Sequence, residues 1–295
     1  MTGYISPAKV NLFFRVLGKR PDHYHEIATL FAAVGIYDRI EISKSESDSF
    51  WCSDYSIPTD SGNRVIKALH LFRAKTEIFV PVSIDLVKAI PVKAGLGGGS
   101  SNASTTLYAL NQLFDQPLSI AELQELGAKI GSDEAFFFTS GLAFGQGRGE
   151  ILSEIEENIA LNGVTVAMPD YVSLGTNDVF DACSPNDFTT GIPADILSAF
   201  FIDTKTAVND LEQTAFRVNP EMKWIKEELI NLGFSHAVMT GSGSAFVCYG
   251  EVHSPKMEGI TFYIVPFLKR EPESWYAIPP PGRFPLDSKK GFCVQ

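Results

Sequence analysis

A glycine-rich segment near the middle of the chain restricts what this sequence can fold into more than any other feature. Residues 91–104 read Pro-Val-Lys-Ala-Gly-Leu-Gly-Gly-Gly-Ser-Ser-Asn-Ala-Ser. Glycine allows backbone N–H groups to turn inward with no Cβ in the way, so this loop can approach an anion closely. Apolar residues then recur at helical spacing over residues 103–114, which predicts a helix whose N-terminus faces the same anion. We therefore expect a phosphate site, because a flexible linker does not open an amphipathic helix.

Three common phosphate-binding motifs can be compared with this segment. It lacks the lysine that follows the glycines of a P-loop, and the chain lacks the His-Arg-Asp and Asp-Phe-Gly motifs of protein kinases. The dinucleotide fingerprint is closer, because Gly95 and Gly97 have its spacing and Asp115 lies 20 positions after Gly95. However, Ser100 replaces its third glycine, and Asp115 follows a predicted helix instead of a second strand. A dinucleotide-dependent oxidoreductase therefore remains the second interpretation.

The composition narrows the class of protein. A chain of 295 residues can form two domains, and its 45% hydrophobic content is that of a globular protein. The net charge of −11 argues against a nucleic-acid surface, and the longest apolar stretch, 27–37, is too short to cross a bilayer. The 4 cysteines are scattered with no Cys-x-x-Cys pair, which indicates reduced thiols and neither zinc nor disulfides. We expect a cytoplasmic protein with small-molecule partners, no nucleic acid and no membrane; the sequence does not predict its oligomeric state.

The order of strand-like and helix-like patterns predicts a mixed fold of two domains. The predicted helices cover 64–72, 100–114, 123–130 and 222–232, and the predicted strands cover 80–86, 164–168, 236–240 and 245–249. The apolar pattern lapses after residue 148, so we place the domains at 1–155 and 156–295. The tail from about residue 271 is rich in proline and aperiodic, which predicts a segment extended over the surface or disordered.

A second glycine loop, Gly241-Ser242-Gly243-Ser244, lies between the last two predicted strands. Taken alone, it is equally consistent with an ordinary hairpin turn. Together with the first glycine loop, it suggests a wall that closes over a shared site.

Three segments together resemble the three motifs of the GHMP kinases, a superfamily that includes galactokinase, homoserine kinase, mevalonate kinase and phosphomevalonate kinase. These segments are 6–12, 91–104 and 239–245. Within the superfamily, the pair Tyr24-His25 and the segment 209–212 resemble the kinases that act on 4-diphosphocytidyl-2-C-methyl-D-erythritol. The resemblance covers roughly residues 4–250. In one departure, His23 stands where that family usually has glycine.

The resemblance implies an α+β fold of two domains. The N-terminal domain would be like domain 2 of ribosomal protein S5, the C-terminal domain would be a ferredoxin-like α/β sandwich, and the active site would lie in the cleft between them. It also implies transfer of the γ-phosphoryl group of ATP to the 2-hydroxyl of the methylerythritol unit, in the non-mevalonate isoprenoid pathway. Mg²⁺ is expected with ATP, but the sequence shows no ligand motif; Ser100 and Ser101 are candidate partners, and the ligands remain unknown.

The resemblance also assigns the catalytic and nucleotide-binding residues. An alcohol is a poor nucleophile and needs a carboxylate within hydrogen-bond reach, which the resemblance identifies as Asp133, with Lys9 to stabilise its charge. Taken alone, Asp133 would be a helix N-cap and Lys9 a solvated edge residue. The ATP-binding residues implied are Asn63, Pro91, Val92, Lys93, Ala94, Gly95, Leu96, Gly97, Gly98, Gly99, Ser100 and Ser101.

The substrate side needs a cytosine pocket and contacts to the polyol. The resemblance places the cytidine against Tyr24 and His25, one by stacking and the other by hydrogen bonds to the base edge. Asn11 would lie near the reacting polyol, and Thr176 and Phe180 would complete the pocket, with Phe180 as a second aromatic face. Tyr24-His25 and Phe180 are also consistent with ordinary packing. The alternatives within this fold are a mevalonate or homoserine kinase, which recognises no cytosine, and a sensor that has lost turnover.

Overall fold

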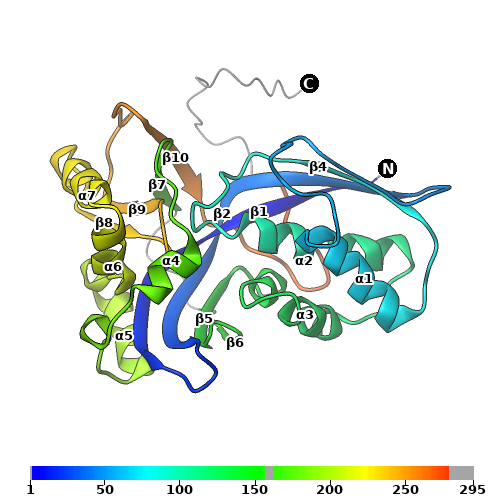
Figure 1. The fold of residues 1–295 in the computed structure, drawn as a ribbon, viewed down its shortest axis with the longest axis horizontal. Helices are drawn as coiled ribbons and strands as arrows, with labels where there is room; N and C mark the ends of the chain where they lie inside the picture. The colour runs from blue at the N-terminus through cyan, green and yellow to red at the C-terminus, as the bar shows by residue number, and fades with distance from the viewer. Residues whose placement is uncertain (1, 157–162, 279–295) are drawn as a thin grey trace.

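The computed structural model describes residues 2–156 and 163–278, which form two β-sheets with helices packed against them (Figure 1). The first sheet has six strands and the second has four. This mixture of sheet and helix confirms the predicted α+β class. The predicted boundary at 155/156 adjoins residues 157–162, which lie outside the described residues, so the domain limits remain a prediction.

Two long antiparallel strands, β1 (Thr2–Lys19) and β2 (His25–Lys44), run through both halves of the molecule (Figure 1). Most of their residues are buried, so both strands read as nearly continuous apolar runs instead of alternating patterns. The pairing shifts register between Pro7 and Ala8. Because proline cannot donate a ladder hydrogen bond, this irregularity fits Pro7, and it re-aims the segment that carries Lys9.

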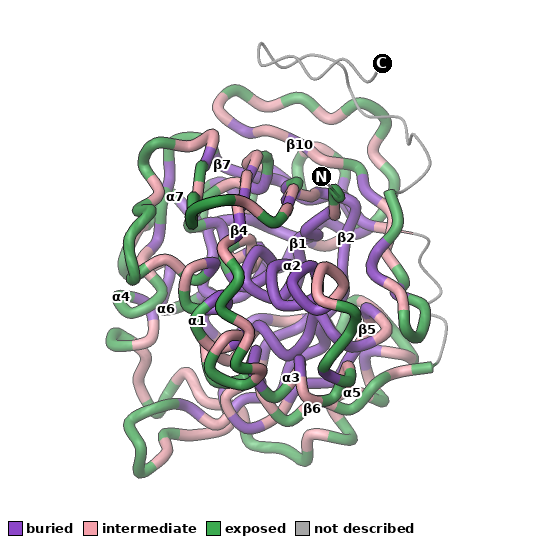
Figure 2. The backbone as a smooth tube through the Cα atoms, turned by 90° about the vertical axis from the view of Figure 1, so that its right-hand side faces the viewer, coloured by how far each residue is buried: buried purple, intermediate pink, exposed green. Residues whose placement is uncertain are grey.

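The other strands of the first sheet give the order β3-β4-β2-β5-β6, with β1 paired to β2 outside that path. Their bounds are Ser49–Cys52 (β3), Val82–Val87 (β4), Leu142–Gly147 (β5) and Ile151–Glu154 (β6). Helices α1 (Arg64–Thr76), α2 (Gly98–Leu113) and α3 (Ile120–Ala128) and the short 3₁₀ helix η1 (Glu134–Phe138) pack against the sheet. Their buried apolar side chains form a core at the centre of this half (Figure 2).

The second sheet is antiparallel, with the order β10-β7-β9-β8. Its strands are β7 (Gly163–Pro169), β8 (His236–Met239), β9 (Phe246–Tyr249) and β10 (Ile260–Pro266). Between β7 and β8 lie the helices α4 (Thr176–Asp181), α5 (Pro193–Ile202), α6 (Leu211–Val218) and α7 (Glu221–Asn231), and the 3₁₀ turns η2 (Pro185–Asp187) and η3 (Thr204–Thr206). In chain order the strands read 4-1-3-2, which is the ferredoxin-like order that was expected.

The segment after β10 returns to the first sheet. The ring of Trp275 stacks on Tyr108 of α2 with 4.7 Å between centroids, and its indole N–H donates to the carbonyl of Ile5 at 2.8 Å. Trp275 and Tyr276 are both buried. The prediction that the tail from 271 lies extended over the surface is therefore wrong for these two residues, because this aromatic pair adds apolar area to the core. Residues 279–295, with most of the tail prolines and Cys293, lie outside the described residues.

Candidate active site

A cleft of about 1170 Å³ brings together the two glycine loops, β1, the start of β2 and helix α4. Every residue that the sequence analysis assigned to the site lines this cleft except Ser101. The hydroxyl of Ser101 is buried and bonds to Ser6 Oγ at 2.8 Å, and its N–H donates to the carbonyl of Gly97. Ser101 therefore lies behind the lining of the cleft, with its polar groups paired within the protein, and its assignment to ATP stays a prediction.

The first glycine loop presents a helix N-terminus to the cleft, as predicted. Helix α2 begins at Gly98, and Gly97 caps it with a left-handed φ of 67°. A Cβ at Gly97 would lie 2.8 Å from Cγ of Lys9, and a Cβ at Gly95 would lie 2.3 Å from the carbonyl oxygen of Thr240. Glycine is thus required at these two positions by close contacts within the protein, in addition to any need for space around a phosphate.

The second glycine loop is both a hairpin and a wall of the cleft. It joins β8 to β9, and the N–H of Ala245 donates to the carbonyl of Ala94 in the first loop at 3.2 Å. Asn209 holds this loop in place, because its amide nitrogen donates to the carbonyls of Met239 and Gly241 at 2.6 and 2.7 Å. This contact gives a structural reason for asparagine in the segment 209–212.

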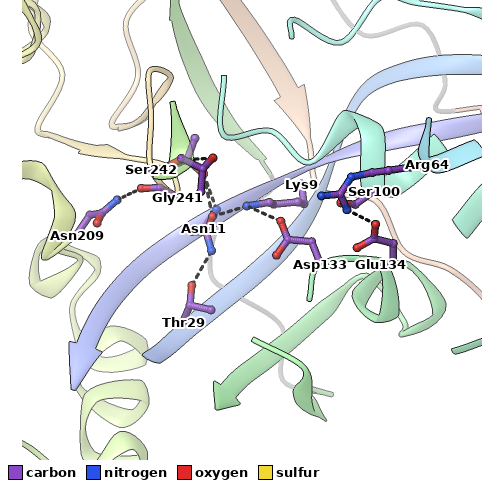
Figure 3. Close-up of polar contacts among 12 residues, drawn as sticks. Lys9, Asn11, Thr29, Arg64, Ser100, Asp133, Glu134, Asn209, Gly241 and Ser242 are labelled. Atoms are coloured by element: carbon purple, nitrogen blue, oxygen red, sulfur yellow. Dashed lines mark hydrogen bonds and ion pairs between the residues drawn. The ribbon is translucent and has the colours of Figure 1, made fainter. Parts of the chain in front are cut away.

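Lys9 and Asp133 meet on the floor of the cleft (Figure 3). Nζ of Lys9 lies 3.6 Å from Oδ2 of Asp133. The lysine side chain is only 5% exposed while the aspartate is 36% exposed, so the ammonium is shielded and the carboxylate stays open to a ligand. Asp133 precedes η1, but its carboxylate makes no capping hydrogen bond within the described chain. Asp133 thus occupies the N-cap position of η1 without a side-chain capping bond, and Lys9 is buried, so the alternative of a solvated lysine does not hold.

The amide of Asn11 fixes the position of the Lys9 ammonium. Its Oδ1 accepts from Lys9 Nζ at 2.7 Å, and its Nδ2 donates to Thr29 Oγ1 at 2.8 Å. Thr29 in turn donates to the carbonyl of Phe13 at 2.6 Å, and the Asn11 N–H donates to Thr240 Oγ1 at 2.7 Å. Because the oxygen and the nitrogen of the Asn11 amide each have a partner, the orientation of the amide is fixed. The amide oxygen in turn fixes the position of the Lys9 ammonium.

Aromatic side chains gather at the other end of the cleft. The imidazole of His25 and the ring of Phe180 are 5.3 Å apart, and the guanidinium of Arg148 lies 4.7 Å from the ring of the half-exposed Tyr24. Burial, with a smaller effect from the charge of Lys19, lowers the pKa of His25. Burial thus favours the neutral form of the imidazole. Phe180 also contacts Phe14, with 6.2 Å between ring centroids, and its pairing with Tyr24 around a base remains a prediction.

Asn63 has a structural function at the nucleotide end. Its Oδ1 accepts from the N–H of Val65, which caps α1, and its Nδ2 donates to the carbonyl of Pro58 at 2.6 Å. Other charged residues lie close to this site and were not predicted, because a lone charge on a strand, helix or loop carries no signal of its own. Arg64, Lys88 and Arg148 line the cleft, and Glu134 lies next to Asp133. Among the described residues no group of three or more His, Cys, Asp or Glu side chains is placed to hold a metal ion.

Comparison with known families agrees with this geometry. The family model described as the GHMP kinases N-terminal domain matches residues 63–141, and the one described as GHMP kinases C-terminal matches 201–251. The solved homoserine kinase from Cytophaga hutchinsonii shares the fold, with a TM-score of 0.68 at 15% identity over 90% of this chain and 94% of that chain. The fold and the cleft are those of a GHMP kinase, which excludes the dinucleotide-dependent oxidoreductase.

More similar relatives narrow the family. The 4-diphosphocytidyl-2-C-methyl-D-erythritol kinase of Protochlamydia amoebophila is 38% identical over 93% of both chains, and that of Chlamydia trachomatis serovar D is 35% identical over 93% of this chain and 96% of its own. A solved 4-(cytidine 5'-diphospho)-2C-methyl-D-erythritol kinase has a TM-score of 0.73 at 32% identity, covering 85% of this chain and 90% of its own. The chain belongs to the 4-diphosphocytidyl-2-C-methyl-D-erythritol kinase family. In the described part of the chain, no helix is long and apolar enough to cross a membrane.

Proposed function

We propose that this protein transfers the γ-phosphoryl group of ATP to the 2-hydroxyl of 4-diphosphocytidyl-2-C-methyl-D-erythritol, giving ADP and the 2-phosphate. This is a step in the non-mevalonate route to isoprenoid precursors. The observation that carries the proposal is the position of the Lys9–Asp133 pair between a glycine-lined helix N-terminus and an aromatic pocket, in a member of this family. We also propose that the protein acts in the cytoplasm.

In this proposal Asp133 is the general base. Its exposed carboxylate accepts the proton of the acceptor hydroxyl as that oxygen bonds to the γ-phosphorus and the bond to the bridging oxygen of ADP breaks. Lys9 offsets the negative charge that collects at this point. Asn11 acts through Lys9 by keeping the ammonium in place, and the polyol lies near these two side chains.

The nucleotide phosphates are proposed to lie against the first glycine loop and the N-terminus of α2. Residues 91–100 supply backbone groups and the hydroxyl of Ser100, and Asn63 lies beside the adenine. Ser100 and Asp133 line this part of the cleft, and no cluster of three or more carboxylate, His or Cys side chains occurs among the described residues. These residues fit a Mg²⁺ ion that takes most of its ligands from phosphate and water. Such an ion would neutralise phosphate charge.

The cytidine is proposed to occupy the aromatic end. Tyr24 and Phe180 offer ring faces for the base, and the neutral imidazole of His25 offers one donor and one acceptor to its edge. Thr176 lies at the start of α4, with its hydroxyl 3.1 Å from Ser242 Oγ, so the second glycine loop and the pocket share this contact.

The test is release of ADP from ATP in the presence of three acceptors. We expect turnover with the cytidine-diphosphate methylerythritol and none with mevalonate or homoserine. Asp133→Asn serves as the inactive control for contaminating kinases. Turnover only with mevalonate or homoserine would contradict the proposal, and no turnover with any acceptor would identify a sensor that has lost activity.

A further inference from the structure

Arg64 and Glu134 form an ion pair that the proposed reaction does not use. Arg64 is the first residue of α1, and Glu134 is the first residue of η1, directly after Asp133. Nη1 of Arg64 contacts Oε1 of Glu134 and donates to Ser100 Oγ at 3.2 Å (Figure 3). The guanidinium thus joins three segments that meet at the nucleotide end of the cleft.

The two partners differ sharply in burial. The Glu134 side chain is 0% exposed, whereas that of Arg64 is 46% exposed and lines the cleft. Oε2 of Glu134 has no hydrogen-bond partner in the described chain, and burial raises the pKa of this carboxyl. A buried carboxylate of this kind contributes little to stability compared with an apolar side chain of similar volume. The function of the ion pair therefore lies in the Arg64 guanidinium, which the pair holds at the surface of the cleft.

Gly131 makes room for the pair, and Gly99 lies in ordinary contact range of the arginine side chain. A Cβ at Gly131 would lie 2.7 Å from both Nη1 of Arg64 and Oε2 of Glu134, and a Cβ at Gly99 would lie 3.5 Å from Cδ of Arg64. The arginine side chain therefore passes over the first turn of α2, where the helix dipole favours anions. Within the described chain, Arg64 makes both of its side-chain hydrogen bonds through Nη1. Its Nε and Nη2 carry the parallel donors through which a guanidinium binds phosphate.

We propose that Arg64 binds a phosphate group of the nucleotide and that Glu134 is a positioning residue that holds the guanidinium over the N-terminus of α2. This inference rests on the proposed function in that the ligand is ATP. It adds a guanidinium to the phosphate site, on the side of the cleft away from Asn11 (Figure 3).

The test measures binding of ADP and of adenosine to the full chain by calorimetry, at one salt concentration and without acceptor. Arg64→Gln should weaken ADP about tenfold, which is about 1.4 kcal/mol, and change adenosine by less than about twofold. Arg64→Lys keeps the charge but loses the parallel donors, so we expect a smaller loss. Arg73→Gln is the matched control, because Arg73 lies on the same helix and pairs with Asp48 outside the cleft.

A second variant separates positioning from folding. Glu134→Gln should raise the KM for ATP by about threefold with little change in kcat, and should have no further effect on ADP binding in the Arg64→Gln background. Equal ADP affinity in wild type and Arg64→Gln, or an equal loss of adenosine, would overturn the inference. A fall in kcat on Glu134→Gln with unchanged KM for ATP would also overturn it. Wild type that does not bind ADP would instead refute the proposed function.

Discussion

The two ends of the cleft are built in different ways. At the nucleotide end, one continuous segment, 91–100, supplies the loop and the start of α2, and in the proposed function its backbone groups face the phosphates. At the acceptor end, the pocket is made of side chains from separate segments: Tyr24 and His25 at the start of β2, Arg148 after β5, and Phe180 in α4. A site formed by backbone groups depends on one continuous sequence motif. A site formed by side chains from separate segments depends on the fold that brings those segments together.

This contrast has consequences for substitution. The nucleotide end is sensitive to a Cβ added at Gly95 or Gly97, because these two glycines lie in left-handed conformations against neighbouring atoms. In the proposed function, the acceptor end is sensitive to the chemistry of its rings, because it distinguishes one base from another. The Lys9–Asp133 pair lies between the two ends and belongs to neither.

The largest expected effect is at this junction. Asp133→Asn keeps the shape of the side chain and removes the base, so kcat should fall by about 10²–10⁴ while the affinity for ATP barely changes. Asp195→Asn, on the exposed side of α5, is the matched control. Single-turnover rates should be measured so that chemistry is observed directly. A variant that keeps more than about a tenth of the wild-type rate would remove Asp133 from the mechanism.

The glycines of the nucleotide end should differ from one another. Gly97→Ala places a Cβ 2.8 Å from Lys9 Cγ at a φ of 67°, so it should displace the ammonium and lower kcat by about 10²-fold. Gly99→Ala meets only Cδ of Arg64 at 3.5 Å, so its effect should be much smaller. Steady-state kinetics of both variants, with thermal unfolding as a control for folding, makes the comparison. Equal effects would show that the loop excludes any Cβ because of the phosphate alone.

The acceptor end should discriminate between bases. Cytosine and uracil present opposite donor and acceptor orders, and a mismatched buried group costs about 1–3 kcal/mol. The uridine analogue should therefore be a poor substrate, and His25→Ala should narrow the gap between the two. Phe180→Leu should weaken both alike, because stacking tolerates any base. The measurement is kcat/KM for both analogues in the three proteins, and equal use of them by wild type would rule out a cytosine pocket.

The smallest effect concerns pH. Because the folded protein lowers the pKa of His25 below its usual 6.5, folding favours the neutral imidazole. The associated stability is fully present above about pH 6.5 and is lost as the pH falls through the lowered pKa. Denaturant unfolding between about pH 7.5 and pH 5 should show a smaller acid loss for His25→Gln than for wild type. A larger loss in the variant would mean that the folded state favours the protonated ring.

The same contrast explains what the sequence could predict. The glycine loop, the start of α2 near Gly98 and the Asp133 position follow from local patterns and a family resemblance. The strands β1 and β2 were not predicted, because burial on both faces removes the alternation that marks a strand. Arg64 and Glu134 were missed for a different reason: they are 70 positions apart, and their charges meet only because α1 and η1 both pack against α2. Ser101 was assigned to ATP because it belongs to the same continuous motif as Ser100. Successive residues of a helix face different sides, and the hydroxyl of Ser101 contacts Ser6.

The segment that follows β10 has a consequence for the synthesis of the chain. The guanidinium of Arg270 binds the carbonyls of Phe138 and Thr139 at the end of η1, and Trp275 fills the core beside Phe138. These late residues complete a layer whose strands and helices all leave the ribosome before the second sheet does. The core of the first half therefore stays incomplete until the second half and the segment after it have been synthesised. A chain truncated before Arg270 keeps every residue of the proposed catalytic site but loses the contacts of Arg270 and Trp275 with the end of η1. Asp133, which directly precedes η1, should then be poorly positioned. Limited proteolysis of the truncated protein should show faster cleavage near η1 than in the full chain.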